Sequence, residues 1–348
     1  MVIFRSISDV KEKLRHPVVT IGNFDGVHLG HREIFRRVRE AARERDGVSV
    51  VVTFVPHPLQ VVSPGTGVKL ITTTSEKESL IAAAGIDYLL EIPFDWNFAS
   101  IPAVEFVEKI LVGTLGIEQL VIGYDYAFGR GREGNVDLLH KLGEQFSFRV
   151  EVLEPISNGA TIYSSTAVRN MLSAGDVRGV VSVLGRHYAV TGTVVHGHQR
   201  GRGLGFPTAN LCIQKDLLPA AGVYAVKVRV GEEFLDGACN IGTNPTFDND
   251  RLSLEVFLFD FEGDLYGREV TMFFMDRLRG EMRFPSVEAL KEAIAADVAR
   301  CRRILAELRD WHPGGGEDGH RVREAESKPE APVLSGSPRK GGVPHKSR

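Results

Sequence analysis

The chain has little cysteine and lacks any long apolar segment. Its 348 residues include three widely spaced cysteines, Cys212, Cys239 and Cys301. An odd number at this spacing is neither a disulfide framework nor a zinc-ligand pattern, so we expect a reducing compartment. No stretch approaches the roughly 20 apolar residues of a membrane helix, and residues 1–17 lack the apolar core of a signal peptide. We therefore expect a soluble, cytoplasmic protein without a membrane partner.

Neither sign of charge dominates the chain. Lysine and arginine number 42 and aspartate and glutamate 45, which gives a net charge of -3. This balance argues against broad binding to nucleic acid, so we do not expect nucleic acid as a partner. The hydrophobic content of 43% is typical of globular proteins, and the length suits two domains. Whether the chain forms a homo-oligomer stays open.

Residues 1–185 alternate between strand-like and helix-like segments. The expected strands lie at 17–22, 48–55, 87–94, 119–123 and 148–156. The expected helices lie at 32–45, 75–86, 102–116 and 136–146. Ser75 is a plausible helix cap. This alternation predicts an α/β domain with a parallel sheet that helices cover on both faces, and with ligands at the carboxyl ends of the strands.

The pattern changes after residue 185. Residues 186–312 contain short β-rich segments at 188–197, 222–231, 233–242, 253–261 and 268–280. Their spacing predicts an antiparallel barrel or sandwich, and one helix at 286–308 closes this second domain. Residues 313–348 are rich in Gly, Pro, Ser and charge, which is typical of a disordered tail. We interpret the basic end of this tail as a solvated segment rather than a binding arm.

The stretch GNFDGVHLGH, residues 22–31, places two histidines where a helix is expected to begin. His28 and His31 are three residues apart, so both can face one side of the first turn. A helix N-terminus favours a phosphate, and imidazoles beside it can donate hydrogen bonds to phosphate oxygens. Glycines at 22, 26 and 30 allow a ligand to approach the backbone. Two partly buried histidines that cap a helix remain the alternative; the His-Glu-x-x-His zinc motif is absent.

This stretch resembles the HxGH signature of the nucleotidyltransferase superfamily. TFVPHP (53–58), GYDYAFG (123–129) and YSSTAVRNML (163–172) are similar, in order, to the adenylylation motifs of prokaryotic bifunctional riboflavin kinase/FAD synthetases. The resemblance implies a Rossmann-like domain that transfers AMP from ATP to FMN and releases pyrophosphate. It implies catalytic roles for His28 and His31 and a flavin contact for His57. It implies ATP contacts for Gly22, Phe24, Asp25, Gly30, Asp125, Ser164, Ser165, Thr166 and Arg169.

A second stretch, HGHQRGRGLGFPTANL, covers residues 196–211. Its glycines make a pliable loop, and two arginines make that loop cationic. On an extended segment Thr208 and Asn210 point the same way, and their oxygens suit a Mg²⁺ ion beside phosphates. The GxxxxGK[ST] phosphate loop is absent, which disfavours an ordinary P-loop kinase. A glycine loop followed by a plain strand stays the alternative.

This stretch looks like the flavokinase signature, and residues 222–226, 240–247, 254–267 and 278–290 are similar to that family's other blocks. The resemblance implies that Glu255 is the general base that takes a proton from the riboflavin 5'-hydroxyl. It implies a Mg²⁺ cofactor on Thr208 and Asn210. It implies ATP contacts at Gly197, Arg200, Gly203, Gly205 and Pro207, and flavin contacts at Asn240, Arg279 and Phe284. This chain has Phe257 where the family often carries a histidine.

The sequence therefore predicts an enzyme that uses riboflavin, FMN and ATP as small-molecule substrates in two successive steps. One alternative is a chain in which only the kinase acts and the first domain is a decayed nucleotide binder. The intact residues His28, His31 and Arg169 speak against it. A second alternative is a flavin-responsive binding protein without catalysis, which needs neither a general base nor magnesium ligands.

Overall fold

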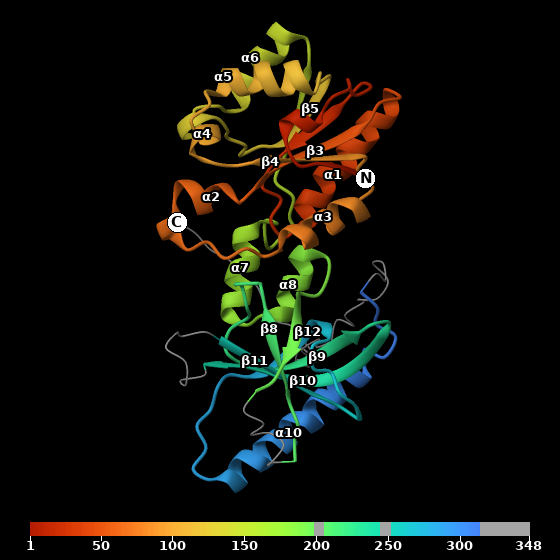
Figure 1. The fold of residues 1–348 in the computed structure, drawn as a ribbon, viewed down its shortest axis with the longest axis vertical. Coiled ribbons are helices and arrows are strands. Elements are labelled where there is room, and N and C mark those ends of the chain that lie inside the picture. The colour runs from red at the N-terminus through yellow and green to blue at the C-terminus, as the bar shows by residue number, and fades with distance from the viewer. Residues whose placement is uncertain (198–204, 244–251, 314–348) are drawn as a thin grey trace, which may run out of the picture. The chain divides into compact units, whose positions relative to one another are not determined.

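The computed structural model describes residues 1–197, 205–243 and 252–313 (Figure 1). Six parallel strands form a sheet in the order β1-β4-β3-β2-β5-β6. These strands are β1 (Val2–Phe4), β2 (Val18–Ile21), β3 (Ser49–Val55), β4 (Tyr88–Pro93), β5 (Gln119–Gly123) and β6 (Arg149–Leu153). The predicted parallel α/β architecture is confirmed. The edge strand β1 was not predicted, because three residues at a chain end carry no readable period.

Alternation along the strands explains why helices cover both faces of this sheet. Val19 and Val50 face one cluster, which the segment from 103 to 114 and α6 complete, whereas Val18 and Val51 face α1 and α3. The helices are α1 (Leu29–Glu44), α2 (Pro58–Val62), α3 (Thr74–Ala83), α4 (Trp96–Ala99), α5 (Ala103–Glu105), α6 (Val136–Phe146), α7 (Ser165–Ala174) and α8 (Val177–Leu184). Short 3-10 turns are η1 (Ile7–Asp9), η2 (Pro64–Thr66) and η4 (Arg130–Arg132).

Two local predictions need correction. The cap of α3 is Thr73 and not Ser75, because Thr73 and Glu76 form a reciprocal capping box with N···O distances of 2.8 and 3.2 Å. The helix expected at 102–116 is present, but most of it, η3 (Phe106–Thr114), has the wider π-helical hydrogen bonding. The apolar positions fit either helix type, so the spacing alone did not distinguish them.

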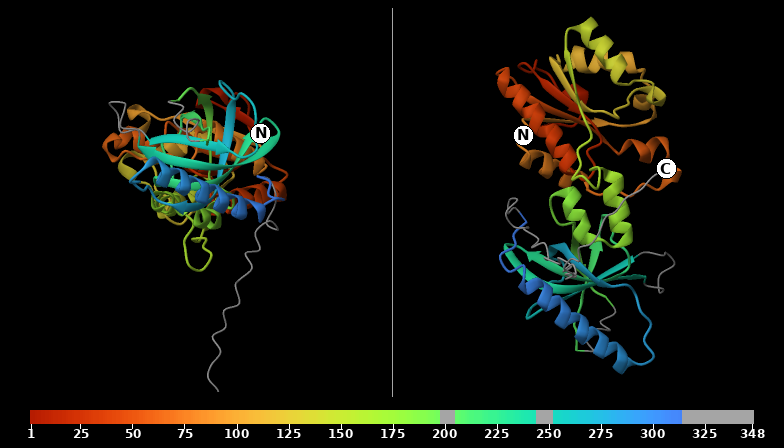
Figure 2. Two further views of the ribbon diagram at one scale, coloured as in Figure 1. Left: turned by 90° about the horizontal axis from the view of Figure 1, so that it is seen from below. Right: turned by 180° about the vertical axis from the view of Figure 1, so that it is seen from behind.

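The second half forms a closed antiparallel barrel in the order β10-β11-β8-β7-β12-β9 (Figure 2). Its strands are β7 (Ala189–Val195), β8 (Ala209–Ile213), β9 (Gly222–Val230), β10 (Glu233–Thr243), β11 (Leu252–Leu258) and β12 (Glu269–Arg279). The barrel interpretation is confirmed over the sandwich. β8 was read only as an extended segment; its pairing with β7 and β11 closes the sheet.

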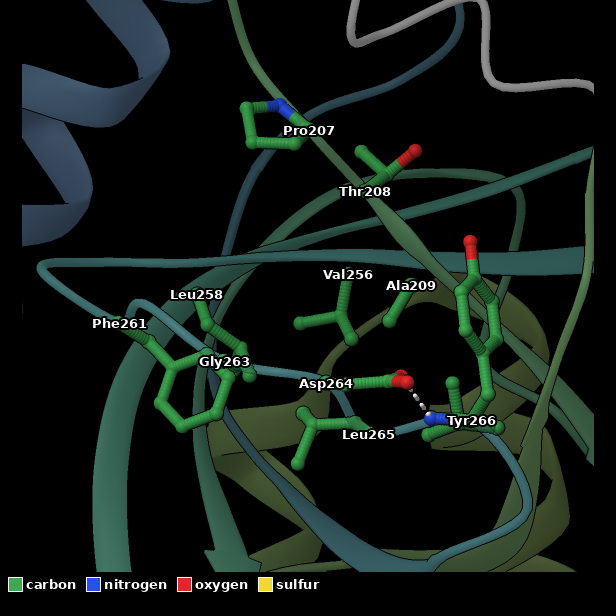
Figure 3. Close-up of a pocket in the computed structure, with 11 residues that line it drawn as sticks. Pro207, Thr208, Ala209, Val256, Leu258, Phe261, Gly263, Asp264, Leu265 and Tyr266 are labelled. Carbon is green, nitrogen blue, oxygen red and sulfur yellow. Dashed lines mark hydrogen bonds between the residues drawn. The ribbon is translucent and has the colours of Figure 1, made fainter.

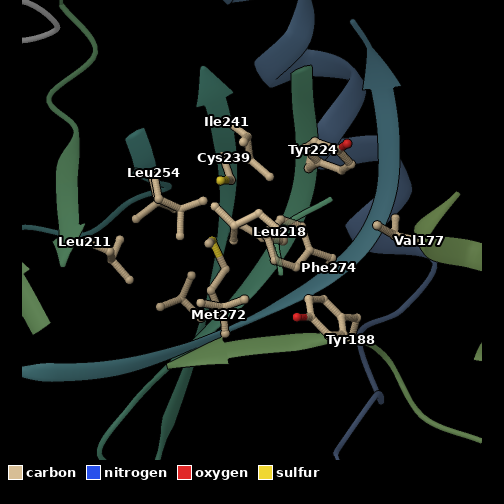
Figure 4. Packing of buried hydrophobic residues seen from close by; sticks show 14 of the residues in the cluster. Val177, Tyr188, Leu211, Leu218, Tyr224, Cys239, Ile241, Leu254, Met272 and Phe274 are labelled. Carbon is tan, nitrogen blue, oxygen red and sulfur yellow. The ribbon is translucent and has the colours of Figure 1, made fainter. Parts of the chain in front are cut away.

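Inward side chains pack the middle of the barrel. Tyr224, Met272 and Phe274 have no exposed surface and pack around Cys239 and Leu254 (Figure 4). The same cluster includes side chains of α7 and α8. Helix α10 (Val287–Ala306), which Ser286 caps, contacts β9, β10 and β12. In the part of the chain that the structure describes, no helix is long and apolar enough to span a membrane.

Candidate active sites

The loop between β2 and α1 has an unusual backbone. Phe24, Gly26 and Val27 have φ angles of 48, 85 and 40 degrees, all in the left-handed region. This conformation is ordinary for glycine but rare for a β-branched residue such as Val27. Such strain persists only where surrounding contacts determine the conformation, and it concentrates at functional sites.

Hydrogen bonds hold this loop from three directions. The Asp25 carboxylate accepts the backbone N–H groups of Ile71 and Thr72 at 3.0 and 3.1 Å. The Ser165 hydroxyl donates to the Asp25 carbonyl at 2.9 Å. The guanidinium of Arg186 donates to the carbonyls of Gly26 and Val27 at 2.7 and 3.3 Å. The loop is therefore fixed before a substrate arrives.

The two histidines stack at the start of α1. Their ring centroids are 3.5 Å apart, and the His28 ring caps the helix by accepting the backbone N–H of His31 at 3.3 Å. Burial, and then the charge of Arg186, lowers the pKa of His28 to about 4; burial also holds the pKa of His31 well below its usual range. Both rings are thus neutral at pH 7. Since Nδ1 of His28 is an acceptor, its proton lies on Nε2, which makes Nε2 a hydrogen-bond donor.

These rings line a cavity of about 350 Å³ at the carboxyl end of the sheet. Nine predicted residues lie around it: Gly22, Phe24, His28, Gly30, His31, Asp125, Ser164, Ser165 and Thr166. A Cβ atom at Gly22 would lie 2.9 Å from the Phe24 ring, and one at Gly30 would lie 3.1 Å from the His28 ring, so a larger residue at either position would push against the ring. Nδ1 of His31 is buried and has no hydrogen-bond partner among the described residues.

Asp25 and Arg169 do not line this cavity. They form an ion pair with each other, and Arg169 also donates to the carbonyl of Lys69 at 2.8 Å. Ser164 caps α7 by accepting the N–H of Ala167 at 3.1 Å. Asp25 is part of the loop, and its carboxylate and Arg169 connect the loop to residues 69–72. Their direct contact with ATP stays a prediction.

A smaller cavity of about 140 Å³ lies beside the same loop. His57 lines it, caps α2 through the N–H of Leu59 at 3.2 Å, and has its pKa lowered to about 4, mainly by burial. Asp25 and the buried Lys77 also line this cavity. His57 was predicted to contact the flavin, and this placement makes the cavity the candidate flavin end of the adenylylation site.

In the barrel, strand register brings Glu255 together with the two predicted metal ligands. Glu255 on β11 pairs with Asn210 on β8, and the Thr208 hydroxyl donates to Oε2 of Glu255 at 3.3 Å. Leu254 and Val256 point into the barrel core, so Glu255 points to the outer face. The apolar run around this acid is therefore one buried face of a strand, and the acid itself is half-buried.

Glu255 lines a cavity of about 370 Å³ that all three predicted barrel flavin contacts, Asn240, Arg279 and Phe284, also line. Arg279 binds the carboxylate of Asp297 with two nitrogens at 2.7 and 3.0 Å and lies over the Phe284 ring at 5.6 Å. The rings of Phe206 and Phe257 meet edge to face at 5.6 Å in the same wall. These aromatic walls suit a planar ring system.

A fourth cavity of about 410 Å³ also has Thr208 in its wall. Figure 3 shows Pro207, Asp264 and Tyr266 in its wall, with the Tyr266 N–H donating to Asp264 at 2.9 Å. Thr208 belongs to the walls of this cavity and of the one that contains Glu255. Two ligands bound in these cavities would therefore meet at Thr208.

The glycine loop is described only in part. Gly205 has a φ of 89 degrees, and a Cβ atom at Gly197 would lie 2.2 Å from the amide nitrogen of Asn210, so both positions require glycine. Arg200 and Gly203 lie outside the described residues. In the described residues, no group of three or more His, Cys, Asp or Glu side chains could hold a metal ion. The candidate metal ligands remain the oxygens of Thr208 and Asn210.

Sequence reasoning missed two cations at the first site. Lys77 lies on the face of α3 that also buries Ile81, four residues later, so its place on an apolar helical face was a usable signal. Arg186 follows a glycine in a short connection and reaches the carbonyls of residues 160 positions away. Such a contact is set by tertiary structure, and local sequence carries no sign of it.

The fold separates into two parts, an α/β sheet and a closed barrel, and each part has cavities of its own. Family models agree: residues 10–167 match FAD synthetase and residues 184–305 match riboflavin kinase. The bifunctional riboflavin kinase/FMN adenylyltransferase of Escherichia coli strain K12 is 41% identical over 289 residues, which cover 83% of this chain and 92% of that protein. The Pseudomonas fluorescens protein of the same name is 40% identical over 307 residues, with coverages of 88% and 98%.

A solved structure from Streptococcus pneumoniae, described as a macrolide-efflux protein, has the same fold. Its TM-score is 0.79 at 32% identity, over 86% of this chain and 98% of that chain. The two family models and the long relatives leave one assignment. The chain belongs to the family of bifunctional riboflavin kinases/FMN adenylyltransferases.

Proposed function

We propose that the barrel phosphorylates riboflavin with ATP to give FMN and ADP, and that the α/β domain then transfers AMP from a second ATP to FMN. The products of the second step are FAD and pyrophosphate. The observation that carries the first step is the place of Thr208 between two cavities, next to Glu255. The observation that carries the second is the stacked, neutral histidine pair at a helix N-terminus.

In the first step, Glu255 takes the proton of the riboflavin 5'-hydroxyl as that oxygen attacks the γ-phosphorus of ATP. The bond from this phosphorus to the β,γ-bridging oxygen breaks and ADP leaves. Phe206, Phe257 and Phe284 hold the ring system in the cavity, and Arg279 stays oriented by Asp297. General-base catalysis by a positioned carboxylate contributes typically about 10²- to 10⁴-fold.

Thr208 and Asn210 supply hydroxyl and amide oxygens beside the carboxylate of Glu255. Mg²⁺ prefers hard oxygen ligands and usually keeps few protein ligands beside substrate phosphates, so this donor set fits it. When bound, the ion neutralises charge on the ATP phosphates. The two protein oxygens orient the phosphates toward the cavity that Glu255 lines.

In the second step, a phosphate oxygen of FMN attacks the α-phosphorus of ATP, and the bond to the α,β-bridging oxygen breaks. The His28 Nε2–H group donates to the phosphate oxygens as charge develops on them. The fixed loop and the α1 N-terminus hold the triphosphate in place. No proton transfer by a histidine is required, because the attacking phosphate is already an anion.

We place this chemistry in the cytoplasm, since Cys212, Cys239 and Cys301 are all free thiols. The test is a chromatographic assay of the purified chain with Mg²⁺. Riboflavin and ATP should yield FMN and then FAD, and FMN and ATP should yield FAD directly. If the first mixture yields neither flavin nucleotide, the proposal is wrong.

A further inference from the structure

Lys77, Lys215 and Lys227 are the three buried lysines among the described residues, with 8%, 7% and 6% exposure. Two of them are neutralised inside the protein. Lys215 pairs with Glu76 at 2.7 Å, and Lys227 pairs with Asp236 at 2.8 Å. Lys77 forms no ion pair with any described residue. A buried charge is normally paired, so Lys77 is the exception that requires a reason.

The contacts of Lys77 satisfy only part of its ammonium group. Nζ donates to the Thr53 hydroxyl at 3.0 Å and to the Asn23 carbonyl at 3.5 Å. An ammonium group has three N–H donors, so one donor remains for another acceptor. Both protein acceptors are neutral and leave the positive charge uncompensated.

The carboxylates that act most strongly on the charge of Lys77 already form ion pairs with arginines. Glu91 and Asp25 both act on the charge of Lys77, but Glu91 pairs with Arg5 and Asp25 pairs with Arg169. Glu78 also acts on Lys77 and shares Arg5 with Glu91, and none of these three carboxylates forms an ion pair with Lys77, so the ammonium group lacks a carboxylate of its own among the described residues. A mobile anion from a substrate can neutralise it at no cost to another ion pair.

The position of Lys77 indicates which substrate supplies this anion. Lys77 lines the cavity that also contains His57 and Asp25, and it does not line the cavity of His28 and His31. Its charge nevertheless lowers the pKa of both His57 and His31, so it lies close to both cavities. An anion at Lys77 would sit on the flavin side of the histidine loop, facing the ATP site.

We propose that Lys77 binds the phosphate of FMN and positions it for attack on ATP. This inference rests on the proposed adenylylation step. The flavin ring is neutral, so the phosphate is the group of FMN that a buried ammonium selects. Lys77 also explains how this site discriminates against riboflavin, which lacks the phosphate and leaves the cation unpaired.

The test compares Lys77→Met with Lys227→Met in steady-state FAD synthesis. Loss of a charge-assisted contact should raise the KM for FMN about ten- to hundredfold in Lys77→Met, with the KM for ATP within about twofold of wild type. Lys77→Arg should recover most of the loss. Lys227→Met removes an equally buried lysine from the barrel and should leave both KM values unchanged.

Circular dichroism of the same preparations reports whether each variant is folded, and riboflavin phosphorylation reports whether the barrel is intact. If Lys77→Met does not fold, Lys77→Gln removes the charge while keeping a donor toward Thr53. An unchanged KM for FMN, or a larger increase in the KM for ATP, would overturn the inference. Failure of the wild-type chain to form FAD would instead overturn the proposed function, so the two failures are distinguishable.

Discussion

The two sites differ in how many of their polar groups are already bonded within the protein. Around the histidines, the polar groups of Asp25, Arg169 and Arg186 all have hydrogen-bond partners within the protein. Asp25 accepts from the backbone at residue 71, Arg169 donates to the carbonyl of residue 69, and Arg186 donates to the carbonyl of residue 26. In the barrel, the hydrogen bond described for the Glu255 carboxylate comes from Thr208 at 3.3 Å. The first site is preorganised by a strained loop that these hydrogen bonds hold in place. The second site contains an acid on a strand whose carboxylate can accept further hydrogen bonds from a substrate. Substitutions in the loop of the first site should therefore change the stability of the protein as well as its activity. Substitutions in the second site should change activity alone.

The largest effect is expected from Glu255→Gln. Removal of the base should lower the rate of FMN formation about 10³-fold, with no loss of stability, because the amide keeps the size of the side chain and the contact to Thr208. FAD synthesis from supplied FMN should be unchanged. The matched control is Glu269→Gln on the exposed face of β12. Kinase activity within about tenfold of wild type in Glu255→Gln would remove this residue from the role of general base.

His28→Asn should have the reverse effect, of somewhat smaller size. Asparagine caps helices well, so α1 should persist while the donor at Nε2 is lost. We expect FAD formation to fall about 10²- to 10³-fold, as for loss of one preorganised donor, with riboflavin phosphorylation intact. Both reactions are measured by chromatography of the flavins. Equal loss of the two activities in a folded protein would contradict the two-site comparison.

Two ion pairs of unequal burial test how much the Asp25–Arg169 pair stabilises the loop before α1. Asp25→Asn removes the carboxylate that holds Arg169 and the segment at 71–72, with side-chain exposures of 6% for Asp25 and 21% for Arg169. We expect a loss of about 2 kcal/mol in the free energy of unfolding, because the half-buried Arg169 and the N–H groups at 71–72 lose their charged partner. Asp260→Asn breaks the exposed pair with Arg302 and should leave the urea midpoint unchanged. Equal losses in the free energy of unfolding for the two variants would show that the Asp25–Arg169 pair contributes no more than an exposed ion pair.

Local sequence patterns predicted the type of each element and which side chains share a face of it. They did not predict which elements pack against one another. The helix start at His28 and the carboxyl-end position of Asp125 follow from strand and helix periods, and the structure confirms both. The side of β11 on which Glu255 lies follows from alternation with Leu254 and Val256. Closure of the barrel depends on β8, which the sequence analysis treated as an extended segment without assigning it to the sheet.

The contacts that lay beyond sequence reasoning join elements that are separated in the sequence. Arg186 clamps a loop from the far end of the α/β half, and Lys77 meets Thr53 through a contact between α3 and β3. No local pattern specifies such partners, because they depend on which elements become neighbours. The predicted ATP contacts of Asp25 and Arg169 rested on motif order and stay predictions.

An effect of about the same size as that of Asp25→Asn concerns the stability of the first site in acid. The pKa of His57 is lowered from its usual 6.5 to about 4, chiefly by burial, with Arg169 and Lys77 opposing protonation and Asp25 favouring it. Below pH 6.5 the unfolded chain therefore binds a proton that the folded chain refuses, so stability falls as the pH drops from 6.5 to 4 and is unaffected above 6.5. At about 1.4 kcal/mol per unit of pKa difference, His57 accounts for about 2 to 3 kcal/mol of this loss.

His57→Asn keeps the cap of α2. In urea unfolding at pH 7.5 and pH 4.5, the variant should lose less stability between the two pH values than wild type, by that amount. Since His28 titrates in the same range, the difference between wild type and variant is the measured quantity, and parallel curves would show that His57 is not held neutral by the fold.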